Sequence, residues 1–332
     1  MAEFSQSEVE VIEDLSLDFQ ADIDLARVAE LIQSEQFSAH DFRIKLSKDP
    51  ALRKEATPEI WAATAVQMGR EVEKKVSAGK AEEAERILRL DYIISAESEA
   101  QTGLDLIKTL DEFLRLKPTV EAIFSQDDQQ LEKSYNYVNE FSETDYESTL
   151  IQNKRDLMNL YQEWEKEDLS TESINQGIEI YQKCSDVFER GFPNLLALKR
   201  ILDGQEPSVD VLQRKSASSV RRELTEGEPG SNSAYFDLIV NAFDNSLRNG
   251  IAHNDLITDP GKSEVRIPSK GFSYSYENFN EIVTENLANA IFLTGAFRSL
   301  IEWHAITSNT DYRDPRPDWV FDPEPQYQTN SE

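Results

Sequence analysis

One hexapeptide contains two residue types that together can cleave RNA. It reads Arg248-Asn249-Gly250-Ile251-Ala252-His253, in a chain that has only three histidines. An imidazole can move the proton of a ribose 2′-hydroxyl, while a guanidinium stabilises the charge of the phosphorane. Because neither step needs a metal ion, the pattern predicts a metal-independent ribonuclease site.

The spacing of this motif sets a geometric condition. Residues five apart on a regular helix point about 140° away from each other, so Arg248 and His253 would not converge there. Gly250 could end or deform the helix and bring them together, or two copies of the chain could pool their residues across a dimer axis. Asp244 lies four residues before Arg248 and is expected to hold its guanidinium.

A simpler interpretation of the same residues stays open. Arg248 and Asp244 could form an ordinary surface ion pair, and His253 could cap a helix or pack beneath a neighbouring hairpin. In that case the motif would have a structural role only.

The elements around the motif follow from its flanking sequence. A helix is predicted to begin at Ala234, with Ser233 as its N-cap, and to run into the hexapeptide. Alternation at period two then predicts a short β-hairpin, formed by residues 264–267 and 272–276 around Pro-Ser-Lys-Gly. A wide apolar stripe predicts a final core helix over residues 278–305.

The fold class is predicted as mainly α. Residues 7–225 have a helical pattern almost throughout, and the chain has only 12 glycines and 12 prolines. A domain boundary is expected before Pro193. It would separate a helical region of recognition or regulation (1–190) from a C-terminal domain (191–308), followed by a disordered, acidic, proline-rich tail (309–332).

The charge of the chain limits its contacts with nucleic acid. The net charge is −29, and such a surface on average repels polyanions. Residues 190–222 nevertheless hold seven basic residues and three acidic ones. The basic residues are Arg190, Lys199, Arg200, Arg214, Lys215, Arg221 and Arg222. The last four are candidate RNA contacts. A solvated helix face whose basic residues pair with nearby acids would give the same sequence pattern.

Other site classes find no support in the sequence. The single Cys184 excludes a disulfide framework or a cysteine zinc site within one chain, and we expect neither a metal nor a cofactor. No window has the roughly 18 apolar residues of a membrane span, and the acidic N-terminus is unlike a signal peptide. A cytoplasmic protein without membrane contact is therefore expected.

The stretch from Phe236 to Asn254, followed by the hairpin and the closing helix, resembles the HEPN superfamily, which is marked by R-x(4–6)-H and often by R-N-x-x-x-H. The resemblance covers about residues 195–305. It implies a helical bundle that dimerises, with two motifs lining a shared cleft, and metal-independent endonucleolytic cleavage of RNA. His253 would then act on the 2′-hydroxyl, Arg248 would stabilise the phosphate charge, and Asn249 would orient one of them.

Two functions are therefore expected as alternatives. The first is an endoribonuclease, set as a toxin or an antiviral defence effector and restrained by a protein regulator that binds the N-terminal helical region. The second is a HEPN-like dimerisation or ligand-binding module without catalysis, within a helical sensor or scaffold protein.

Overall fold

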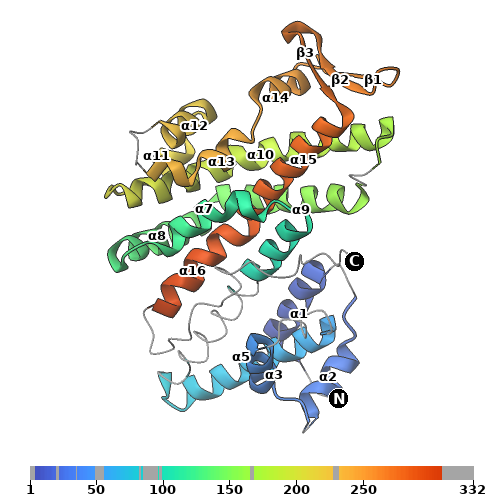
Figure 1. Ribbon diagram of the computed structural model, residues 1–332. Helices are drawn as coiled ribbons and strands as arrows, with labels where there is room; N and C mark the ends of the chain where they lie inside the picture. The colour runs from blue at the N-terminus through green and yellow to red at the C-terminus, as the bar shows by residue number, and fades with distance from the viewer. Residues whose placement is uncertain are drawn as a thin grey trace, which may run out of the picture. The chain divides into compact units, whose positions relative to one another are not determined.

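The fold is mainly α-helical with one small antiparallel sheet, as predicted (Figure 1). The computed structural model describes residues 4–19, 22–34, 36–48, 56–81, 84, 96, 99–164, 168–226 and 232–308. The chain forms two compact units, Met1–Ser98 and Glu99–Glu332. Each unit has its own arrangement of helices.

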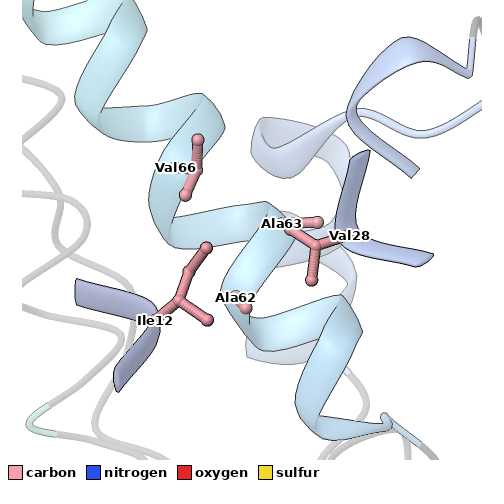
Figure 2. Close-up of a cluster of buried hydrophobic side chains, with 5 residues drawn as sticks. All are labelled: Ile12, Val28, Ala62, Ala63 and Val66. Carbon is pink, nitrogen blue, oxygen red and sulfur yellow. The ribbon is translucent and has the colours of Figure 1, made fainter. Parts of the chain in front are cut away.

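The first unit is built around one long helix. Its described helices are α1 (Gln6–Phe19), α2 (Leu25–Gln33), α3 (Ala39–Lys48) and α5 (Pro58–Ser77). Figure 2 shows its apolar cluster, in which α5 contributes Ala62, Ala63 and Val66, α1 contributes Ile12, and α2 contributes Val28. The two alanines let the neighbouring helices approach α5 closely, since they add little side-chain volume.

The second unit carries the sequence motif. Besides the helical residues 99–109, its described helices are α7 (Phe113–Phe124), α8 (Asp128–Ser142), α9 (Asp145–Glu163), α10 (Thr171–Leu202), α11 (Val209–Gln213), α12 (Ala217–Thr225), α13 (Asp237–Asn241), α14 (Asn245–Ala252), α15 (Tyr276–Ile291) and α16 (Phe297–Ser308). The helices α10 and α15 pack against each other along the core, and a π-helical turn at Phe292–Ala296 joins α15 to α16. The predicted final helix is thus confirmed, with this turn inside it.

The predicted boundary between residues 190 and 191 needs correction. It falls within α10, an uninterrupted helix of 32 residues that includes Pro193. Pro193 removes one backbone hydrogen-bond donor. The neighbouring side chains of Phe188, Phe192 and Leu196 are buried, and the free energy gained by burying them outweighs that loss. The compact units divide at Ser98 and Glu99 instead. The predicted disordered tail, 309–332, lies outside the described residues.

The segment before the motif also differs from the prediction. In place of one helix from Ala234, a 3-10 turn (Asn232–Tyr235) precedes α13, and α14 begins anew at Asn245. The reason is Asp244, whose carboxylate accepts hydrogen bonds from the backbone N–H groups of Ser246 (2.7 Å) and Leu247 (3.2 Å). Such an N-cap satisfies the free donors at a helix start.

The predicted hairpin is confirmed and belongs to a three-stranded sheet in the order β1-β2-β3. The strands are β1 (Ile257–Asp259), β2 (Glu264–Ile267) and β3 (Phe272–Ser275). The connection between β2 and β3 is a 3-10 turn, Pro268–Lys270, and Gly271 follows it at φ 66°. Glycine reaches this left-handed region without steric cost. The three-residue strand β1 is too short for the alternation pattern to reveal.

Gly250 does not end the helix, which was one of the two ways considered for bringing Arg248 and His253 together. The helix continues through Ala252 and ends with Asn254 at φ 52°. There the N–H of Asp255 donates to the Gly250 carbonyl (2.8 Å), and the N–H of Asn254 donates to that of Ile251 (3.1 Å). These two bonds form a Schellman motif. Glycine stands at position 250 because β2 packs there: an added Cβ would lie 3.1 Å from the Ile267 Cγ1 atom.

Gly250→Ala is therefore expected to lower the free energy of unfolding by about 1 kcal/mol, because the new methyl group meets a β-branched side chain held in a strand. Gly69→Ala is the matched control. Gly69 lies inside α5 with no atom near its missing Cβ, so this change should stabilise by up to about 1 kcal/mol through helix propensity. Urea unfolding would measure both. Stabilisation by both variants would contradict the close contact between Gly250 and Ile267.

Candidate functional site

The helix α14 carries the whole hexapeptide except His253, which follows as its C-cap residue. It contacts α10 and β2, and Figure 1 shows it beside the sheet, close to one end of α15. Its direction is set by the break that separates it from α13. The residues at this break therefore decide where the motif side chains point.

Two tyrosines hold Asp244 at the break. The Tyr274 hydroxyl, from β3, donates to the Asp244 Oδ2 atom at 2.6 Å. The Tyr181 hydroxyl, from α10, donates to the Asp244 carbonyl at 2.8 Å and accepts from its backbone N–H at 3.0 Å. Burial and the neighbouring carboxylate raise the pKa of Tyr274, so its hydroxyl keeps the proton that it donates. Asp244 therefore serves the backbone of α14.

Side chains from two other helices satisfy the carbonyls at the end of α13. Asn289 and Asn286, both in α15, donate to the carbonyls of Ile239 (3.2 Å) and Ala242 (2.9 Å). Arg221, in α12, donates to the carbonyls of Val240 (3.4 Å) and Phe243 (3.0 Å). Helix-end carbonyls have no partner within their own helix and need one when buried. The sequence signal for Asn286 and Asn289 is their position on the apolar face of the closing helix.

Arg248 pairs with α10 and not with Asp244, so the predicted role of Asp244 is wrong. The Arg248 Nη2 atom lies 3.0 Å from the Glu189 Oε1 atom, and both side chains are about half exposed. Its Nη1 atom lies 3.5 Å from the Asn249 Oδ1 atom, a long hydrogen bond. The amide of Asn249 is thus in position to orient the guanidinium of Arg248.

His253 is exposed and does not pack beneath the hairpin. Its backbone N–H donates to the Asn249 carbonyl (3.0 Å), the last regular bond of the helix, and its imidazole lies in solvent. Because α14 is regular from Arg248 to Ala252, the two side chains diverge by about 140°. In the described part of the chain, no hydrogen bond or ion pair joins Arg248 to His253.

The basic residues of the segment 190–222 are largely neutralised. Arg214 lies 3.4 Å from Asp210, Arg222 lies 3.7 Å from Glu226, and Lys215 pairs with Glu223, which also binds Arg200. The structure therefore favours the alternative interpretation, a solvated helix face whose basic side chains form ion pairs with nearby acidic ones. Those acids lie in the same segment or just beyond it.

Arg221 differs from the other predicted RNA contacts because it points inward. Its guanidinium lies over the Phe243 ring, 5.0 Å from the ring centroid, and donates to the backbone at the α13–α14 break. Desolvation lowers the pKa of Arg221. Its contacts make it a support of the break and not a phosphate contact.

No family model, no curated protein and no solved structure matches this chain. Among the helices that the structure describes, none is long and apolar enough to cross a membrane. Within the same described residues, no group of three or more His, Cys, Asp or Glu side chains is placed to hold a metal ion.

The N-cap role of Asp244 predicts a specific pattern of mutant stabilities. As an N-cap, Asp244→Ala should lower the free energy of unfolding by about 1–2 kcal/mol. Asp244→Asn should lower this free energy by only a small part of that amount. The amide oxygen can still accept the two backbone hydrogen bonds, and the new amide N–H can donate to the Tyr274 hydroxyl. Urea unfolding of both variants is the measurement. An Asn variant as unstable as the Ala variant would show that the negative charge itself matters.

Proposed function

We propose that the second unit is a metal-independent endoribonuclease of HEPN type, with His253, Arg248 and Asn249 as its reacting and orienting groups. One observation carries the proposal. The break before α14 is held by side chains from α10, α12, α15 and β3, and it presents His253 to solvent at the end of a well-anchored helix. Functional groups on anchored elements are held more accurately than groups on loops.

In the proposed reaction these three residues promote a nucleophilic substitution at phosphorus. The His253 imidazole takes the proton of a ribose 2′-hydroxyl, whose oxygen attacks the adjacent phosphorus as the bond to the 5′-oxygen breaks. Arg248 stabilises the negative charge on the phosphorane oxygens, and Asn249 orients the guanidinium. The leaving 5′-oxygen takes up a proton from solvent or imidazolium. The products are a 2′,3′-cyclic phosphate and a 5′-hydroxyl.

The divergence of Arg248 and His253 favours a site made by two copies of the chain. Since α14 stays regular between the two residues, one copy alone does not direct both side chains at a single phosphate. In a symmetric pair, His253 of one copy and Arg248 of the other can face the same substrate. The homodimer is thus part of the proposal.

We further propose a cytoplasmic toxin or defence effector whose first unit binds a protein regulator. In support, the first unit has its own apolar cluster and contains none of the motif residues. A surface as acidic as this chain's suits a basic protein partner better than a nucleic acid.

A second candidate is a dimerisation or ligand-binding module without catalysis, in a sensor or scaffold protein. The pairing of Arg248 with Glu189 favours it, because a carboxylate already occupies the guanidinium that RNA would need. The neutralised basic segment favours it as well.

Incubating the full chain with single-stranded and structured RNAs in excess EDTA tests the first candidate. We expect cleavage with 2′,3′-cyclic phosphate ends, and its loss in His253→Ala by at least about 100-fold. Asn245→Ala, an exposed change at the opposite end of α14, is the matched control and should cleave normally. Equal cleavage by His253→Ala would exclude the proposed role of His253, and a parent protein that leaves every RNA intact would favour the second candidate.

Glu189 should restrain the enzyme if RNA has to displace it from Arg248. Glu189→Gln is then expected to raise kcat/KM by about two- to fivefold at low salt, the effect of freeing one exposed ion pair. Glu179→Gln removes the same charge from the exposed face of α10, ten residues or about 15 Å away, and should change little. A similar rise in both variants would indicate general charge repulsion, and a fall in Glu189→Gln would mean that Glu189 positions Arg248.

A further inference from the structure

An exposed aromatic side chain begins strand β3. Phe272 is 50% exposed, and it is the only aromatic residue among the large hydrophobic side chains exposed in the described parts of the chain. It stands opposite Ile267 in the sheet register, and directly opposed residues of an antiparallel pair share one face. Ile267 packs on Gly250 of α14. Phe272 therefore lies on the side of the sheet that faces α14.

The turn before Phe272 is tied to the segment that follows His253. The backbone N–H of Ser269 donates to the Asp255 Oδ2 atom at 3.1 Å, and Asp255 is two residues beyond His253. The left-handed Gly271 then reverses the chain into Phe272. These contacts place Phe272 and His253 on neighbouring segments that the bond from Ser269 to Asp255 joins.

The same turn carries an exposed cation, Lys270, which has no carboxylate partner among the described residues. By contrast, Arg214, Lys215 and Arg222 of the basic segment are paired with acids. Residues 257–275 hold three basic and two acidic residues, in a chain whose net charge is −29. Lys270 is thus a cation that a phosphate could pair with without first displacing a described carboxylate.

We propose that the exposed start of β3 and the turn before it bind single-stranded RNA beside the scissile phosphate, with one base stacked on Phe272 and a neighbouring phosphate at Lys270. The inference rests on the proposed function and adds a substrate class to it. Stacking on an aromatic ring accepts any base, but it needs a base that is free of its own helix. The site therefore selects unpaired RNA without strong sequence preference.

Binding can be measured apart from cleavage with a single-stranded RNA that carries 2′-O-methyl groups, because it lacks the attacking hydroxyl. Fluorescence anisotropy with the full chain in EDTA should show Phe272→Ala raising Kd by about tenfold, as expected for one stacked base, while Phe272→Trp keeps the parent Kd. Ile257→Ala is the matched control. Ile257 is 53% exposed and stands opposite Arg266, on the other face of the sheet.

The phosphate contact has its own control. Lys270→Ala should reduce the slope of log Kd against log salt by about one and weaken binding equally across sequences. Lys262→Ala removes an exposed lysine at the other end of the sheet and should keep the parent slope. Equal slopes in the two variants would remove Lys270 from the binding site.

Three results would overturn the inference. If Phe272→Ala and Ile257→Ala bind RNA equally well while the parent cleaves through His253, the inference fails and the proposed function stands. If Phe272→Ala lowers the mass of the protein in sedimentation, the ring lies between copies of the chain. If the parent does not bind single-stranded RNA at all, the inference and the ribonuclease proposal fail together.

Discussion

The arrangement of the second unit depends on one constraint: a helix broken inside a packed core leaves backbone polar groups that must find partners. The break lies between α13 and α14. The side chains of Asn286, Asn289 and Arg221 donate hydrogen bonds to carbonyls at the end of α13. The Asp244 carboxylate accepts from the first free N–H groups of α14. The partners come from α15, from α12 and from the break itself. Leaving one such backbone group unpaired costs about 1–3 kcal/mol, so these contacts stabilise the break.

That geometry determines what the motif can do. The start of α14 is held by Tyr181 and Tyr274, and Gly250 packs on Ile267, so these contacts set how the helix is turned about its axis. Arg248 consequently faces Glu189 on α10, while His253 leaves the helix toward solvent. The same constraint that stabilises the core separates the two groups that the proposed chemistry needs, and this is why a second copy of the chain enters the proposal.

Electrostatics act on a different scale from these contacts. The cations of residues 190–222 cluster in the sequence. Because they pair with acids such as Asp210, Glu223 and Glu226, little net positive charge remains to attract a phosphate. A lysine that is isolated in the sequence, Lys270, remains without such a partner in the described residues. In a chain this acidic, the relevant quantity is the charge left after pairing, and counting basic residues along the sequence does not provide it.

The sequence by itself determined the features that depend on local periodicity and turn chemistry. The helical class, the hairpin around Pro268–Gly271 and the closing helix were all predicted, because side-chain spacing and glycine conformation act over a few residues. It did not determine the role of Asp244, the purpose of Gly250 or the partners of Arg221, and it put a boundary inside α10. Those outcomes depend on which distant groups meet when the core closes. Only the tertiary structure decides this, because backbone groups at a break are satisfied by whatever side chains packing brings to them.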